Sequence, residues 1–254
     1  MMKKMITEFD KLLTQGRDLT EDDWKIKKKS TLTNASRCAI FEYLCLHPCS
    51  SVSGIAKGLN LSESRVRWHL EKLMWDRFVS IKENGSTIFF PSNMINPEHI
   101  KIFKLLALEK SSGIIASIKS KEGLYQNELS RQLDLNIRTI MKYTSDLEYL
   151  GLIRGASDGK YRRYYLTNMM DKLRDYYRKN SKNFKEQIIK KTKMDGLRPT
   201  ILLSTPELLK LKLVVGTKIR VLTIPMIPFG EMRHGLRNLK KERHLQKGIV
   251  SLTQ

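Results

Sequence analysis

The chain has 254 residues, of which 41% are hydrophobic, so its length and composition indicate one or two folded domains and exclude disorder throughout. Its 47 Lys and Arg outnumber 26 Asp and Glu, and the formal net charge of +21 favours a polyanionic partner such as nucleic acid. Residues 171–254 hold +13 of that charge. We therefore expect a polyanion to contact mainly the second half of the chain.

The three cysteines are too few for a disulfide scaffold in a chain of this length, and their odd number fits a reducing compartment. Charged residues interrupt the first apolar residues before a signal-peptide core could form. No stretch approaches the ~18 apolar residues of a membrane-spanning helix. These features predict a soluble, cytoplasmic protein with no membrane partner.

Residues 1–33 are predicted to form a short helix and a linker. Within residues 2–15, four apolar side chains share one side of the expected helix: Met5, Phe9, Leu12 and Leu13. An acidic cluster at residues 21–23 and a basic run at 25–29 follow. We interpret this segment as a docking helix and an exposed linker.

Residues 34–98 show the element order of a winged helix, which is three helices followed by a hairpin. The first helix ends before Pro48, and two more begin near Ser51 and Ser62, whose hydroxyls can cap them. Two β-prone runs, 79–82 and 87–90, then flank Asn84-Gly85, a dipeptide that favours a type I′ hairpin turn.

The same order is predicted again in residues 99–170. The expected helices are 111–120, 126–133 and 137–150, and the expected strands are 153–154 and 161–166, around a turn at Asp158-Gly159. Sliding the chain along itself until Val66 meets Ile140 aligns the two units without a gap, and the same shift matches Leu73 with Leu147. We call this shift the repeat offset. Most matched apolar positions are those that a three-helix core would bury, so we predict a tandem repeat.

Two segments resemble the helix-turn-helix region of MarR- and ArsR-type winged-helix regulators: LSESRVRWHLEKLMWDRFV (61–79) and LNIRTIMKYTSDLEYLGLI (135–153). The resemblance covers roughly residues 34–168. It implies that the third helix of each unit enters the major groove of DNA and that the hairpin wing lies along the backbone. Tandem pairs in one chain are also similar to archaeal transcription regulators, including activators of archaellum operons.

The expected fold class is therefore α+β and mainly helical. It comprises two tandem winged helix-turn-helix domains, 34–98 and 99–170, after an N-terminal helix and linker over 1–33. A basic linker helix and a small β-containing region, 171–254, complete the chain.

A helix turns by 100° per residue, so placing Val66 and Ile140 in the core identifies the outward residues of each third helix. The residues predicted to bind DNA are Ser62, Ser64, Arg65, Arg67, Trp68, Asn136, Arg138, Thr139, Lys142, Lys160, Arg162 and Arg163. Arg on a recognition helix can pair bidentately with guanine. The caps Ser62 and Asn136 can also contact phosphate, and so can Lys160 with one of the two wing arginines.

Two alternatives accompany this assignment. Outward charges on a helix are commonly just solvated. Outward tryptophans, here Trp68 and Trp75, also pack against a neighbouring domain or a partner protein.

A basic helix is predicted over residues 171–193, with an apolar stripe that suits a dimer contact, a phosphate-tracking helix or a membrane-surface helix. Strands are expected at 200–203, 212–215 and 219–223, with a short helix over 206–211 between the first two. Pro225 and Pro228 exclude a central strand beyond that point. A further basic stretch follows. This region is interpreted as an effector or assembly domain, or as a surface for the transcription machinery.

Cys38, Cys45, His47 and Cys49 lie close together in the sequence, but Pro48 interrupts their helical spacing and paired CxxC motifs are absent. We therefore expect buried structural cysteines and no metal site, and a packed His69. The sequence contains no phosphate-binding Gly-rich loop, HExxH motif or nucleophile elbow. No catalytic residue, cofactor or enzymatic activity is predicted.

Together these features predict a sequence-specific regulator of transcription that binds double-stranded DNA. A homodimer contact through residues 171–193 is a separate expectation. In one alternative function, the first winged helix binds a general transcription factor or RNA polymerase instead of DNA. In another, the protein is an architectural factor that binds DNA through charge alone.

Overall fold

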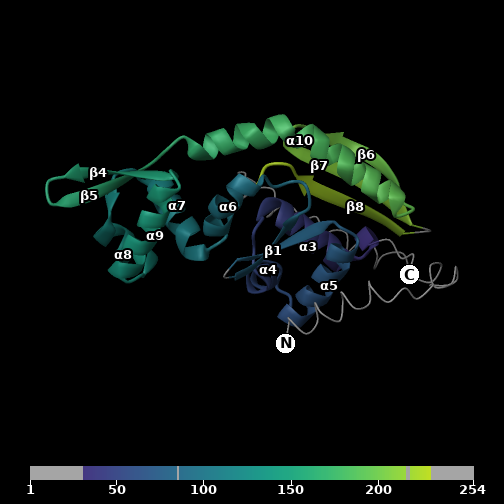
Figure 1. Cartoon of the computed structure of the whole chain (residues 1–254), viewed down its shortest axis with the longest axis horizontal. Coiled ribbons are helices and arrows are strands. Elements are labelled where there is room, and N and C mark those ends of the chain that lie inside the picture. The colour runs from purple at the N-terminus through teal and green to yellow at the C-terminus, as the bar shows by residue number, and fades with distance from the viewer. Residues whose placement is uncertain (1–30, 85, 216–217, 230–254) are drawn as a thin grey trace, which may run out of the picture.

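The computed structural model describes residues 31–84, 86–215 and 218–229 (Figure 1). The helix expected over residues 2–15, the linker up to residue 30, Gly85 of the expected hairpin turn and the basic stretch from residue 230 lie outside the described residues.

The first unit, residues 31–91, consists of a small helical core and a hairpin. Its elements are η1 (Thr31–Thr33), α3 (Ala35–Leu46), α4 (Val52–Leu59), α5 (Glu63–Trp75), β1 (Val79–Asn84) and β2 (Ser86–Pro91). Asn34, Ser51 and Ser62 cap the three α-helices by accepting hydrogen bonds from backbone amides in the first turn. The expected inward residues Val66, Leu70 and Leu73 are buried in the core.

The second unit, residues 109–166, has the same helix order. Its elements are α7 (Glu109–Ser120), β3 (Leu124–Tyr125), α8 (Gln126–Leu133), α9 (Ile137–Tyr149), β4 (Ile153–Asp158) and β5 (Tyr161–Leu166). The three strands form an antiparallel sheet in the order β3-β5-β4. Ile114, Ile118, Leu129, Ile140 and Leu147 are fully buried between the helices.

The two units match residue for residue at their helix ends. The repeat offset carries every bound of α3, α4, α5 and β1 onto the corresponding bound of α7, α8, α9 and β4. It also carries Asn60 onto Asp134, and both residues end a helix in the left-handed conformation, with φ of 54° and 50°. Strand β5 departs from the offset by a single position relative to β2. The repeat offset is therefore a property of the backbone as well as of the apolar pattern.

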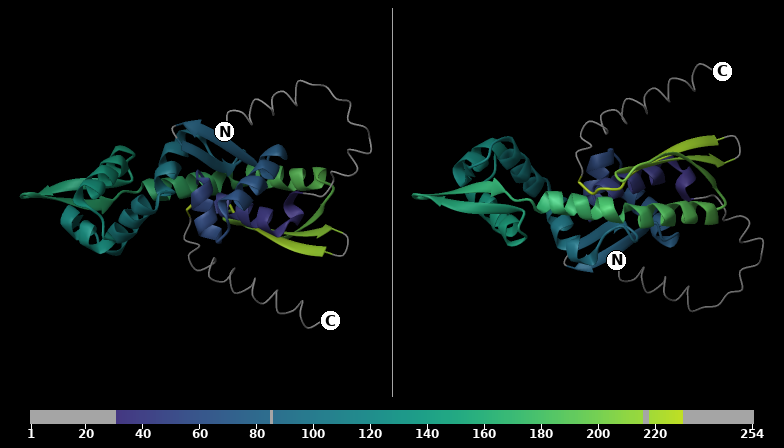
Figure 2. Two further views of the ribbon diagram at one scale, coloured as in Figure 1. Left: turned by 90° about the horizontal axis from the view of Figure 1, so that it is seen from below. Right: turned by 90° about the horizontal axis from the view of Figure 1, so that it is seen from above.

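Between and after the units run η2 (Pro97–His99), α6 (Ile100–Leu106) and the long helix α10 (Met169–Met194). Figure 2 shows α10 along the face of the molecule opposite to the first-unit helices. The apolar stripe of α10, which includes Leu173, Tyr177, Phe184 and Ile188, is buried within the chain itself. This stripe is therefore not exposed for contact with a partner helix or a membrane surface.

A third antiparallel sheet, in the order β6-β7-β8, packs against α3 and α10. Its strands are β6 (Arg198–Ser204), β7 (Leu208–Val215) and β8 (Lys218–Pro225). The Thr223 amide donates to the Glu42 carboxylate of α3 at 2.6 Å, and the Phe229 amide donates to the Leu46 carbonyl at 2.8 Å. These bonds join the C-terminal sheet to the first unit.

The short helix expected over residues 206–211 is wrong. A tight turn links the two strands, in which the Leu208 amide donates to the Thr205 hydroxyl at 3.0 Å, and β7 begins at Leu208. Leu209 and Leu211 are buried, whereas Lys210 between them is partly exposed. This alternation has the period of two that characterises a strand, and it outweighs the helix propensity of leucine and lysine.

Candidate nucleic-acid interface

Helix α9 presents the cationic face that its sequence predicts. Ile140, Thr144 and Leu147 are buried, while Arg138, Lys142, Ser145 and Tyr149 are exposed and Thr139 is partly exposed. Asn136 Oδ1 accepts the Arg138 amide at 2.8 Å and so defines the start of the helix. Helical periodicity and one cap thus direct these side chains away from the core.

The two cations of this face have no carboxylate partner in the part of the chain that the structure describes. Among the described residues, Arg138 and Lys142 form no ion pair within 4 Å. The Lys142 ammonium lies 6.0 Å from the centre of the neighbouring Tyr143 ring. Their charge is consequently available to an anionic ligand.

Helix α5 occupies the corresponding position in the first unit but has a different surface. The Arg65 guanidinium donates to the Ser36 hydroxyl at 3.0 Å, and Arg67 pairs with Glu63 at 3.0 Å. Trp68 and Trp75 are 51% and 61% exposed. This face is therefore more aromatic than that of α9, and both of its arginines have partners within the first unit.

The cap of α5 involves two serine side chains from the predicted set. Ser62 Oγ accepts the Arg65 amide at 3.4 Å, and it lies 3.3 Å from Ser64 Oγ. Both serines are exposed at the start of the helix. A phosphate contact at this position would use hydroxyls that the cap already orients.

The second hairpin holds its three basic residues in different ways. The Lys160 ammonium lies 5.3 Å from the centre of the Tyr161 ring, at the tip of the hairpin. Arg162 pairs with Glu148 of α9 at 2.7 Å. Arg163 pairs with Asp158 at 2.5 Å and also donates to the Gly123 carbonyl at 2.9 Å. Both arginines are thus bound within the protein, and hydrogen bonding to the carboxylates raises their pKa.

Glu148 is a residue of this site that sequence reasoning missed. Glu148 is partly buried on α9. In the sequence it looks like one more polar residue of an amphipathic helix, so nothing local distinguishes it. Its partners, Gly155 and Arg162, belong to the two strands of the hairpin, and only the folded hairpin brings them close.

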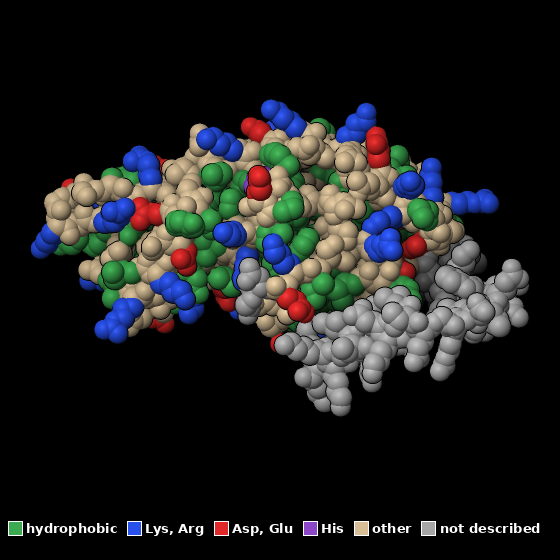
Figure 3. Space-filling model, in the orientation of Figure 1, with side chains coloured by type: hydrophobic (Ala, Val, Ile, Leu, Met, Phe, Trp, Pro, Cys, Tyr) green, Lys and Arg blue, Asp and Glu red, His purple; other side chains and the backbone are tan. Residues whose placement is uncertain are grey.

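Lys and Arg side chains project from the second unit and along the edge of the molecule where α10 runs (Figure 3). Helix α10 contributes six exposed cations: Lys172, Arg178, Lys179, Lys182, Lys190 and Lys193. The strongly basic character of the chain is therefore spread over several elements rather than confined to the two third helices.

The cysteine cluster belongs to the core of the first unit. Cys38, Cys45 and Cys49 are buried thiols, as predicted. Burial raises the pKa of Cys49 to about 12 and lowers that of His47 to about 4, so both groups are neutral near pH 7. In the described part of the chain, no group of three or more potential ligands could hold a metal ion.

His69 is also buried, at 3% exposure, with its ring 4.8 Å from that of Trp68. Burial is the main cause that lowers its pKa, and nearby Arg37 and Arg65 act in the same direction. The prediction of a packed first-unit histidine is confirmed.

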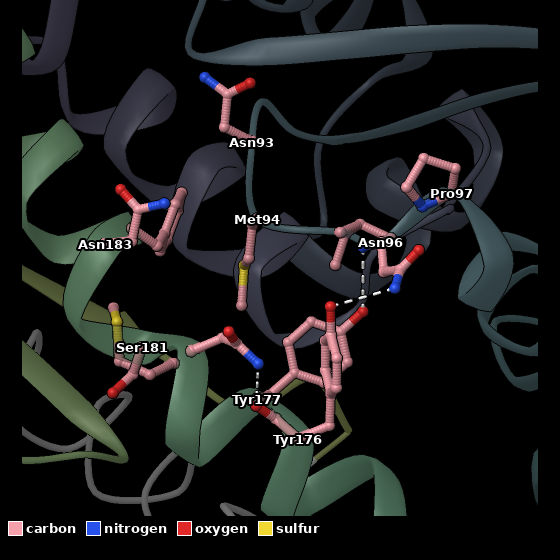
Figure 4. A pocket seen from close by; sticks show the side chains of 12 residues that line it. Asn93, Met94, Asn96, Pro97, Tyr176, Tyr177, Ser181 and Asn183 are labelled. Atoms are coloured by element: carbon pink, nitrogen blue, oxygen red, sulfur yellow. Dashed lines mark hydrogen bonds between the residues drawn. The ribbon is translucent and has the colours of Figure 1, made fainter.

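A separate pocket of about 250 Å³ lies between the loop after β2 and α10 (Figure 4). Hydrogen bonds within its wall join Asn96 to both tyrosines of α10, at 3.3 Å to Tyr177 and 3.0 Å to Tyr176. Its lining contains no charged side chain among the described residues. The pocket thus differs in chemistry from the basic surfaces.

Comparison with known proteins finds a relative among archaeal transcription regulators. An uncharacterised HTH-type transcriptional regulator of Methanocaldococcus jannaschii is 24% identical over 142 residues. The chain is similar to an archaeal helix-turn-helix regulator. This confirms the resemblance drawn from residues 61–79 and 135–153 at the level of helix-turn-helix transcription regulators. The match covers 56% of this chain and 36% of the relative, so the chain spans about a third of that protein's length.

No protein-family model matches the chain. Among solved structures, the alignment with a MarR transcriptional regulator of Methanosarcina mazei covers 56% of this chain and 90% of the regulator, at 14% identity and a TM-score of 0.26. FabT of Streptococcus pneumoniae in complex with DNA covers 51% and 82%, at 15% identity and a TM-score of 0.26. Scores this low do not establish a shared arrangement of the whole chain. Within the described residues, no helix is both long and apolar enough to cross a membrane.

Proposed function

We propose that this protein is a transcription regulator that binds double-stranded DNA in a sequence-specific manner through two tandem winged helices. The proposed domains are 34–98 and 99–170, followed by α10 and the C-terminal sheet in 171–254. The observation that carries the proposal is the repetition of helix bounds and caps at the repeat offset, together with the exposed cationic face on α9.

The second unit is the better candidate for reading bases. Arg138 lies in the first turn of α9, where residues of a recognition helix reach base edges, and Arg pairs bidentately with guanine. Lys142 lies one turn further along the same face, and Asn136 and Thr139 lie beside Arg138 at the start of the helix. Lys160 at the hairpin tip supplies a phosphate contact.

The first unit contributes a weaker DNA contact in this proposal. Ser62 and Ser64 present hydroxyls, and Arg65 and Arg67 supply charge once they leave Ser36 and Glu63. Trp68 adds an apolar contact, such as one to a thymine methyl group. Two units in one chain could then cover two half-sites without an obligate dimer.

The test is selection of bound duplexes from random DNA, followed by fluorescence anisotropy of the selected duplex and a scrambled one across salt concentrations. We expect the selected duplex to bind ~10³-fold more tightly at physiological salt, the lower range for specific regulators. If no sequence is enriched and all duplexes show the same steep salt dependence, the protein binds DNA by charge alone. That result would contradict the proposal and favour the architectural alternative.

A second candidate function is an interaction with the transcription machinery through α5. The exposed Trp68 and Trp75 lie two turns apart on one helix, about 10 Å along its axis, and large exposed aromatic side chains are typical of protein interfaces. Trp68→Ala distinguishes the two roles. A loss of affinity for the selected duplex assigns α5 to DNA, whereas unchanged DNA affinity with loss of polymerase recruitment assigns it to a protein.

A further inference from the structure

Glu148 joins three elements of the second unit through one carboxylate oxygen. Glu148 Oε1 accepts the Gly155 amide of β4 at 2.7 Å and the Arg162 guanidinium of β5 at 2.7 Å. Glu148 itself belongs to α9. A single atom therefore connects the proposed recognition helix to both strands of its wing.

The contact between Glu148 and Arg162 requires a glycine at position 155. A Cβ atom at position 155 would lie 2.3 Å from Arg162 Nε and 2.6 Å from Glu148 Oε1. Gly155 lies within β4. Glycine in the interior of a strand weakens it, and it often marks a place where another group approaches the backbone closely. The missing side chain leaves the space in which the carboxylate and the guanidinium meet.

The first unit lacks this device. At the repeat offset, Met74 corresponds to Glu148 and Ile81 to Gly155, so neither the carboxylate nor the space for it is present. The shared scaffold folds without the contact. The contact is thus an addition specific to the unit with the cationic third helix.

We infer that Glu148 and Arg162 form a latch that sets the angle of the second wing against α9, and that Arg162 is a positioning residue rather than a phosphate contact. The inference rests on the proposed DNA-binding function. With the wing held, the hairpin directs Lys160 at its tip toward the phosphate backbone. The acidic Glu148 then favours DNA binding although its charge repels phosphate.

The sign of the Glu148→Ala effect separates positioning from simple electrostatics. If Arg162 were a phosphate contact restrained by Glu148, removing the carboxylate would free a cation and raise DNA affinity. A latch predicts the reverse, with affinity falling about threefold to tenfold, as expected for one partly exposed charge-assisted pair. Arg162→Ala should have a similar effect, and the double variant should be no worse than either single variant.

The salt dependence of DNA binding distinguishes a residue that contacts phosphate from one that only positions the wing. Lys160→Ala, which removes a phosphate contact, should reduce the slope of log affinity against log salt by ~0.9. In Glu148→Ala and Arg162→Ala, Lys160 still reaches the phosphate in the complex, and the loss of affinity is the cost of ordering a looser wing, so the slope should stay unchanged. Glu148→Gln keeps an acceptor oxygen and should restore most of the affinity. A reduced slope in Arg162→Ala, or tighter binding by Glu148→Ala, would overturn the inference.

Amide hydrogen exchange at Gly155 tests the latch without DNA. In the full chain, Glu148→Ala should speed exchange of the Gly155 amide about tenfold or more, while the amide of Leu152, which donates to the Leu147 carbonyl at 2.9 Å, stays protected and reports an intact unit. Unchanged exchange at Gly155 would refute the latch. If exchange changes but the wild-type chain binds no DNA, the proposed function fails and the latch stands.

Discussion

His47 should make the stability of this protein fall as the pH decreases from neutral. Its ring packs 4.9 Å from that of Tyr43 and 5.5 Å from that of Phe229, between α3 and the end of the C-terminal sheet. Burial lowers its pKa from 6.5 to about 4. The unfolded chain therefore binds a proton at this histidine at a higher pH than the folded chain does.

The size of the effect follows from the two pKa values. Between pH 6.5 and 4 the unfolded state is progressively protonated at His47 while the folded state is not, so the free energy of unfolding decreases with falling pH. With values of 6.5 and about 4, the loss relative to pH 7 is about 2 kcal/mol at pH 5 and about 3 kcal/mol at pH 4. Well below pH 4 the contribution becomes constant.

Urea unfolding of the wild type and of His47→Gln between pH 4 and 8, followed by circular dichroism, measures this contribution. Glutamine does not titrate, so the difference between the two pH profiles isolates His47 from other groups. Asp76 and Asp195, whose pKa values are raised mainly by burial, act in the opposite direction and cancel in the difference. Parallel profiles for the two proteins would show that His47 titrates normally in the folded state and would refute the reasoning.

Three further predictions concern the helices. Gly58→Ala should lower the free energy of unfolding by about 1–3 kcal/mol, because its new Cβ would lie 2.3 Å from the Tyr43 ring. Gly54→Ala is the control: its Cβ would lie 3.4 Å from its nearest neighbour, so the higher helix propensity of alanine should raise the free energy of unfolding by up to about 1 kcal/mol in chemical denaturation. Equal effects of the two substitutions would contradict this reasoning. Leu147→Ala should cost about 2–5 kcal/mol in the same assay, and a smaller loss would show that the core relaxes around the cavity. Arg138→Ala should weaken the selected duplex by about 1–3 kcal/mol and the scrambled duplex much less, and an equal loss on both would assign Arg138 to phosphate instead.

The three helices and the hairpin of each unit could be predicted from the sequence because their signals are local. Ser51, Ser62 and Asn136 can cap a helix, and the structure places each of them at a helix start. The core residues follow from helical periodicity in the same way. These features depend on neighbours within a few residues, so a single sequence reveals them.

The turn before β7 and the partners of the wing arginines could not be predicted in this way. Leucine and lysine favour a helix locally, but β7 forms because it pairs with strands on both sides. Arg162 and Arg163 were both predicted to bind DNA, with one of them contacting phosphate, whereas the observed partner of Arg162 is Glu148, which comes from another element. Both outcomes depend on tertiary contacts that leave no local pattern.

The two units share a scaffold but differ in the groups that they present. Their helix ends coincide at the repeat offset, which keeps the core positions equivalent: Leu73 and Leu147 are both fully buried. At the outward positions, Trp68 of α5 corresponds to Lys142 of α9. Core packing constrains the first set of positions, whereas outward positions change at little cost in stability. A chain built on this repeat can therefore retain one fold in both halves while each half presents different side chains to a ligand.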